Sequence, residues 1–90
     1  MLYGGWWRLI ILLLKQEEKN RVIYDYLPEG RHENVGTLVV DKLTKEVEWV
    51  KKAELYDKVD RGFYSGHAFC QLRKYLELNE YPKKDIVAWY

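Results

Sequence analysis

The sequence has little cysteine and little proline, and basic side chains outnumber acidic ones by only one. A single cysteine, Cys70, excludes an intramolecular disulfide and is typical of reducing compartments, so we expect a cytoplasmic protein. The formal net charge is only +1, and acidic and basic side chains balance along the chain. Because nucleic-acid binding draws much of its affinity from clustered basic side chains, this balance argues against a nucleic-acid partner.

The chain also lacks a hydrophobic run long enough to cross a membrane. Its longest uninterrupted apolar stretch, Leu9–Leu14, has six residues, whereas a transmembrane helix needs roughly 20. No small-residue cleavage site follows this stretch, so it does not indicate a signal peptide, and we expect no membrane association. The lack of alternation favours a strand covered on both faces, although a short buried helix has the same pattern.

The composition is that of one small folded domain spanning residues 1–90. Hydrophobic residues make up 48% and charged residues 32% of the 90-residue chain, a mixture typical of globular proteins. The 4 Trp, 8 Tyr and 2 Phe are many for this length. Bulky aromatics let a small domain bury more area per residue, and they are also enriched in protein interfaces.

The clearest structural signal is a predicted β-hairpin between Gly36 and Val50. With Asp41 opposite Glu46, residues 42–45 form the loop, and its last position, near Lys45, needs a positive φ. One face of this hairpin is then apolar and carries Leu38, Val40, Val47 and Trp49. The other face is mixed and carries Thr37, Val39, Glu48 and Val50.

Two further strands precede this hairpin, and a helix and a strand follow it. Leu9–Lys15 and Arg21–Leu27 flank a polar loop and predict a first hairpin, whereas residues 51–61 show no dominant period. The spacing then becomes helical, with Ser65 as the expected N-cap and Pro82 preventing continuation past Tyr81. The side of this helix that we expect to pack carries Ala68, Phe69, Leu72, Tyr75, Leu76 and Asn79.

The last five residues, 86–90, have strand composition. The sequence therefore predicts the α+β class with the element order ββββαβ: an antiparallel meander of four strands, one helix packed on one face, and a C-terminal strand. The helix around Leu72 is expected to lie on the apolar face of the Gly36–Val50 hairpin. The position of the C-terminal strand in the sheet stays open.

Candidate chemistry is sparse. His67 and Cys70 are three residues apart on the predicted helix, as a thiolate and its activating base would need, but no oxyanion site or orienting partner is marked. A metal site would have to combine His32, His67 and Cys70 with a carboxylate such as Asp60, without any familiar ligand spacing. We therefore expect no enzyme activity, no cofactor and no metal.

A ligand pocket is a further alternative. Its walls would come from four neighbouring residues at the end of the first hairpin: Tyr24, Asp25, Tyr26 and Glu29. A half-exposed strand has the same composition. A small ligand-binding protein, or an enzyme using His67 and Cys70, thus remains the third interpretation.

Protein interaction is the function that the pattern favours. Aromatic side chains gather at both chain ends, and sheet edges are ready sites for pairing with another chain. The predicted interaction residues are Trp6, Trp7, Val39, Val50, Trp89 and Tyr90. We expect a small interaction or assembly module with a protein partner or a homodimeric state. The alternative, a small nucleic-acid binder, would need Lys51, Lys52, Lys83 and Lys84 on one face.

Four sequence stretches resemble small uncharacterised bacterial or phage-associated proteins of about this length. They are Val22-Ile-Tyr-Asp-Tyr-Leu-Pro-Glu-Gly, Gly36-Thr-Leu-Val-Val-Asp, Ser65-Gly-His-Ala and the ending Val87-Ala-Trp-Tyr. The resemblance covers most of the chain. These motifs carry no known chemistry, so the resemblance implies no site residue.

Overall fold

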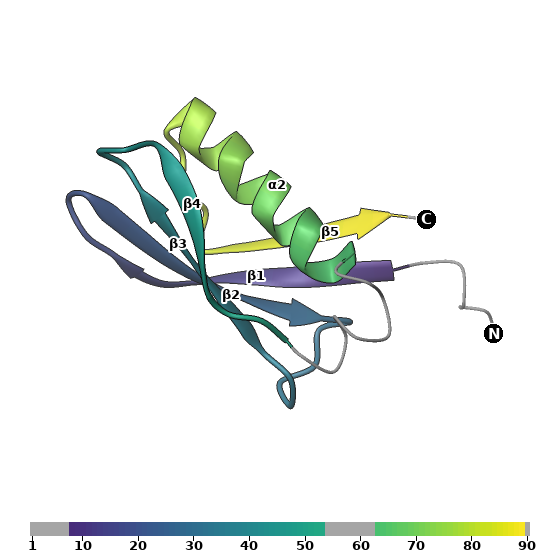
Figure 1. The fold of residues 1–90 in the computed structure, drawn as a ribbon. Helices are drawn as coiled ribbons and strands as arrows, with labels where there is room; N and C mark the ends of the chain where they lie inside the picture. The colour runs from purple at the N-terminus through teal and green to yellow at the C-terminus, as the bar shows by residue number, and fades with distance from the viewer. Residues whose placement is uncertain (1–7, 54–62, 90) are drawn as a thin grey trace, which may run out of the picture.

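The structure, a computed structural model, describes residues 8–53 and 63–89. These residues form five strands and one helix in the predicted order ββββαβ (Figure 1). The elements are β1 (Arg8–Glu17), β2 (Arg21–Pro28), β3 (Gly36–Asp41), β4 (Glu46–Lys51), α2 (Phe63–Leu78) and β5 (Lys84–Trp89).

The strands form a single antiparallel sheet in the order β4-β3-β2-β1-β5. The first four strands are the predicted meander, because short connections bring sequence neighbours side by side. The C-terminal strand pairs with β1 and thus forms the edge opposite β4. The helix lies across one face of the sheet, as predicted, and contacts all five strands (Figure 1).

The β3–β4 hairpin has the predicted register. Val40 lies opposite Val47, Asp41 lies opposite Glu46, and Lys45 has a φ of 60° at the end of the loop. The Asp41 carboxylate accepts hydrogen bonds from two loop amides, those of residues 43 and 44, which fixes the turn. One feature was not predicted: the register shifts between residues 37 and 38, so that Val50 is an extra residue in the β4 edge.

The apolar stretch Leu9–Leu14 is a strand rather than a helix, because it pairs with β2 on one side and with β5 on the other. The predicted loop of the first hairpin was too long. The β1 strand continues to Glu17, and its ladder with β2 shifts by one residue at Lys15. The long twisted ladder is interrupted only by this single bulge, and residues 18–20 form the connection between the two strands.

The helix begins earlier than predicted. It starts at Phe63, so the expected N-cap, Ser65, lies inside its first turn and is buried. Tyr64 is buried beneath this first turn, and its burial stabilises the additional helical residues. The helix ends at Leu78, because Asn79 has a φ of 55° and the amide of Glu80 donates to the carbonyl of residue 75, a Schellman arrangement. The helix therefore ends before it reaches Pro82, the residue that was expected to end it.

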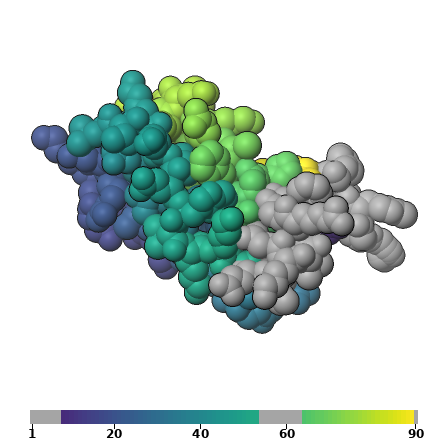
Figure 2. All heavy atoms as spheres, in the orientation of Figure 1, coloured from purple at the N-terminus to yellow at the C-terminus, as the bar shows by residue number. Residues whose placement is uncertain are grey.

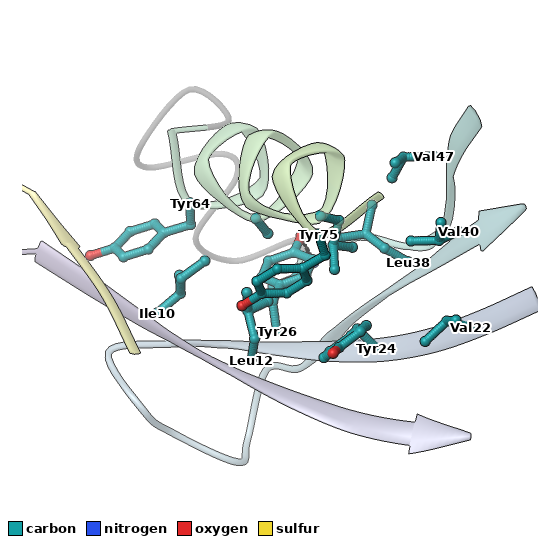
Figure 3. Packing of buried hydrophobic residues seen from close by; sticks show 13 residues of the cluster. Ile10, Leu12, Val22, Tyr24, Tyr26, Leu38, Val40, Val47, Tyr64 and Tyr75 are labelled. Carbon is teal, nitrogen blue, oxygen red and sulfur yellow. Dashed lines mark hydrogen bonds between the residues drawn. The ribbon is translucent and has the colours of Figure 1, made fainter. Parts of the chain in front are cut away.

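The core lies between the helix and the face of the sheet that it covers. Figure 3 shows Tyr24, Tyr26 and Leu38 projecting from the strands, and Tyr75 projecting back from the helix. The rings of Tyr24 and Tyr75 are 5.5 Å apart. The space-filling view shows the helix atoms lying directly against those of the β3–β4 hairpin (Figure 2). Several of the aromatics therefore serve the core.

Gly36 marks the tightest contact of this core. A Cβ atom at this position would lie 2.0 Å from the ring of Tyr26, which crosses directly over the glycine of the neighbouring strand. The Tyr26 hydroxyl accepts a hydrogen bond from the amide of Ala53 at 2.9 Å. Glycine is required here because the ring occupies the space of a side chain.

Within residues 8–53 and 63–89, no helix combines the length and the apolar composition that crossing a bilayer requires.

Candidate functional site: the open face of the sheet

The sheet has a second face, which points away from α2 and which we call the open face. Side chains alternate along a strand, so the residues between the buried core positions project to this face. Its apolar members are Leu9, Ile11, Leu13, Ile23, Leu27, Val39, Ile86 and Ala88. Its polar members include Lys15, Asp25, Thr37, Glu48 and Lys84.

The apolar side chains of the open face form one continuous area across the central strands. Ile11 lies opposite Leu27 on one side and opposite Ile86 on the other, while Ile23 lies opposite Val39. Most of these side chains are half-buried, because neighbours on the sheet shield one another and the turn at Gly30 lies against Ile11, whereas Ile86 is 58% exposed. Only Leu27 is fully buried.

The β1 strand shows why this face is unusual. Its residues are apolar at every position from Leu9 to Leu14, a pattern that predicts cover on both faces. The helix covers the even-numbered positions, of which Ile10 and Leu12 are completely buried. Within the described parts of the chain no helix or second sheet covers the odd-numbered positions, although the turn at Gly30 lies against Ile11. A face of this size and composition is typical of a contact surface.

A polar group interrupts the apolar area near its centre. The carboxylate of Asp25 accepts a hydrogen bond of 2.8 Å from the Thr37 hydroxyl and lies 3.8 Å from the ammonium of Lys15. The Asp25 side chain is 21% exposed, whereas that of Lys15 is 56% exposed. An ion pair this open adds little to stability, but it offers a directional contact to anything that covers the face.

The predicted interaction residues lie in three different places. Val39 belongs to the open face, and Val50, at the β4 bulge, is 63% exposed. Trp89 instead lies on the helix side, where its ring stacks on His67 with a centroid distance of 3.7 Å. The other three, Trp6, Trp7 and Tyr90, lie outside the described residues. The remaining open-face residues were not predicted from the sequence as interaction residues.

The hypothetical His67–Cys70 dyad has an unfavourable environment. The Cys70 thiol is free and exposed, while the imidazole of His67 packs its face against the indole of Trp89. Among the residues that the structure describes, no three His, Cys, Asp or Glu side chains gather as metal ligands would. Asp60, the carboxylate of the hypothetical metal site, lies outside that part of the chain.

The residues of the hypothetical ligand pocket are divided between the two faces of the sheet. Tyr24 and Tyr26 point toward the helix, while Asp25, between them, lies on the open face. The Tyr24 hydroxyl donates to the carbonyl of Pro82, and burial raises the pKa of this tyrosine. Strand alternation therefore prevents these side chains from forming one pocket.

Glu29 lies at the end of the sheet, where β1 begins. Its carboxylate accepts hydrogen bonds from the Tyr64 hydroxyl at 2.7 Å and from the amide of Leu9 at 3.2 Å. Burial raises the pKa of Tyr64 to about 12, and the hydrogen bond to Glu29 adds to this shift. The arrangement ties the start of the helix to the sheet and thus serves the fold.

A hollow of about 460 Å³ lies at the C-terminal end of the helix. It is lined by Tyr75, Leu78, Glu80, Tyr81 and Pro82. All five come from one short segment, so the hollow is a surface depression beside a helix end. Its form suits packing better than enclosure of a small molecule.

The four lysines considered for nucleic-acid binding do not form one patch. Lys51 and Lys52 lie at the end of β4, whereas Lys83 and Lys84 lie at the start of β5, and these strands are opposite edges of the sheet. The ammonium of Lys52 lies over the ring of Trp49, 5.2 Å from its centroid.

Comparison of the chain with protein families, with curated proteins and with solved structures finds no match in any of the three.

Proposed function

We propose that this protein is a small interaction or assembly module whose contact surface is the open face of the sheet. The observation that carries the proposal is β1, which is apolar on both sides although α2 covers only one of them. A strand with one face toward solvent usually alternates apolar and polar side chains. The absence of alternation in β1 is explained if a protein partner covers the open face.

The shape and composition of the open face support this function. Five strands about 4.8 Å apart, with six residues each rising about 3.3 Å, give a flat area of about 24 by 20 Å. The central strands are mostly apolar around Asp25, while Glu48 and Lys84 lie toward the two edges of the face. Apolar centres with polar rims are the usual anatomy of protein interfaces, so the partner should present an apolar surface of similar size.

The free thiol of Cys70 is consistent with action in the cytoplasm, because reducing compartments keep exposed thiols unpaired. We propose the cytoplasm as the place where the partner is met.

Site-specific photo-crosslinking in cells tests the proposal. A photoreactive residue replaces Val39 on the open face, and in a matched variant it replaces Arg73 on the exposed side of the helix. We expect a discrete protein adduct from position 39 only, lost when Leu13→Lys places a charge on the same face. Equal adduct patterns from both positions, or a position-39 adduct indifferent to Leu13→Lys, would contradict the proposal. An adduct of twice the chain mass would identify the partner as a second copy.

The Leu13→Lys variant needs a control for nonspecific effects of an added charge. Leu78, which is 68% exposed near the end of the helix, provides it as Leu78→Lys. This variant has the same chemical change on the opposite side of the molecule. It should leave the position-39 adduct intact.

A further inference from the structure

The two edges of the sheet differ in how they are protected against pairing. The β4 edge carries charged side chains and is interrupted by the bulge at Val50, two devices that discourage a further strand. The β5 edge has neither interruption nor cover within the described residues. All six of its residues, Lys84–Trp89, pair with β1 in one regular register.

The direction of the β5 backbone groups follows from two hydrogen bonds. The amide of Leu14 donates to the carbonyl of Lys83 at 2.9 Å, which makes these two residues a hydrogen-bonded pair. Hydrogen-bonded pairs recur every second residue, so residues 85 and 87 also turn their backbone groups toward β1. The amide of Ile86 does not bond to β1 and donates instead to the Asp85 carboxylate. The backbone groups of Lys84, Ile86 and Ala88 therefore face outward.

We propose that β5 pairs antiparallel with β5 of a second copy, across a twofold axis perpendicular to the sheet. In the central register Ile86 lies opposite Ile86 of the second copy, and Lys84 lies opposite Ala88. Each outward-facing residue then exchanges hydrogen bonds with its counterpart. The amide of Ile86 exchanges its bond to the Asp85 carboxylate for one to the second copy.

The side chains select this register over its neighbours. Asp85 lies opposite Val87, so no like charges face each other across the seam. Sliding the pairing one step toward the N-terminus of β5 would place Asp85 opposite Asp85, and two steps would place Lys84 opposite Lys84. Sliding it the other way would leave Lys84 without a counterpart in the strand. The central register alone uses all outward groups without repulsion.

The area of the open face is a further reason to expect a second copy of the chain beside β5. This step depends on the proposed function. The open face of one copy has a projected area of about 480 Å². A standard interface buries about 800 Å² of accessible surface on each partner, so one open face alone is small for a stable interface. Pairing through β5 joins two open faces into one of about 960 Å², with the two Ile86 side chains at its centre. The protected β4 edges become the outer edges, so the assembly closes at two copies.

A charge-swap experiment on the full chain tests the pairing. Native mass spectrometry at micromolar concentration should show a dimer of the wild-type chain. Ile86→Lys and Ile86→Glu should each weaken the dimer at least about tenfold, because like charges then face each other across the axis. An equimolar mixture of the two variants should restore a dimer that contains one chain of each kind. Val50→Lys, at the other edge, should leave the dimer unchanged.

Three results would overturn the pairing: a monomeric wild-type chain, a dimer that survives both Ile86 variants, or a mixture that forms no mixed dimer. Loss of the dimer with Leu13→Lys but not with the Ile86 variants would assign self-association to the open face and would also reject the β5 seam. Failure here leaves the position-39 crosslink untouched, because that experiment does not require a dimer. Circular dichroism of each variant confirms that the fold is retained.

Discussion

Leu12 and Leu13 are neighbours on β1 with the same side chain, yet they lie on opposite faces of the sheet. Leu12 is completely buried under the helix, while Leu13 is half-buried on the open face. The helix side is also rich in tyrosines with fixed hydroxyl partners: Tyr24 donates to Pro82, and Tyr75 donates to Asp85. The open face is aliphatic instead. The comparison separates side chains that build the fold from side chains that the fold leaves available.

The largest expected difference lies between two truncations on β1. Leu12→Ala should lower the free energy of unfolding by about 3 kcal/mol, because it removes buried contacts and leaves a cavity under the helix. Leu13→Ala should lower it by less than about 1 kcal/mol, because a half-exposed side chain loses little contact and leaves no cavity. Urea denaturation followed by tryptophan fluorescence measures both values.

The same pair distinguishes folding from interaction. Leu13→Ala should reduce the yield of the position-39 crosslink although the protein stays folded. Similar destabilisation by both truncations would mean that the open face is part of the core, and the interaction hypothesis would then lose its main support.

Alkaline pH should destabilise the protein through the buried tyrosines on the helix side of the sheet. Burial raises the pKa of Tyr64 from 10.0 to about 12, and it also raises the pKa of Tyr24 and of Tyr75. A raised pKa favours the protonated form in the folded state, so the stabilisation of the fold by each protonated tyrosine is fully present below pH 10. This stabilisation is lost as the pH rises through the folded-state pKa. For each such tyrosine the free energy of unfolding falls by up to about 1.4 kcal/mol per pH unit between pH 10 and its folded-state pKa.

Tyr64→Phe isolates one share of this effect. The variant has no hydroxyl to ionise, so its stability should fall less steeply than that of the wild type between pH 10 and pH 12. Urea denaturation at a series of pH values measures both slopes. Equal slopes would show that Tyr64 contributes nothing to the alkaline transition.

The sequence predicted those parts of the fold that local pattern determines. The β3–β4 register followed from alternation, because a slip of one residue would have buried Glu46 or Glu48. The position of β5 could not be predicted, because an apolar strand fits beside any open edge. Long-range contacts decide it: the carboxylate of Asp85 accepts hydrogen bonds from Tyr75 and from Gln71 on the helix.

The candidate site was predicted only in part, for a related reason. Val39 could be assigned to the open face because polar side chains alternate with apolar ones on the opposite strand, β4. On β1 both faces are apolar, so periodicity cannot tell Leu13 from Leu12. The helix start was also missed, because burial of Tyr64 outweighs the preference of Ser65 for an N-cap position. Trp89 was assigned to an interface from composition, while its place against His67 depends on the tertiary fold.

The smallest expected effect on stability comes from Asp25, the polar centre of the open face. Asp25→Asn keeps an oxygen that can accept the hydrogen bond from Thr37, and it removes only the solvent-exposed ion pair with Lys15. The free energy of unfolding should therefore change by less than about 0.5 kcal/mol. Within an interface the same charge loses its water, so its removal should alter the yield of the position-39 crosslink much more than the stability. A crosslink yield unchanged in Asp25→Asn would mean that the partner does not cover the centre of this face, and the contact would have to be sought nearer β5, around Ile86.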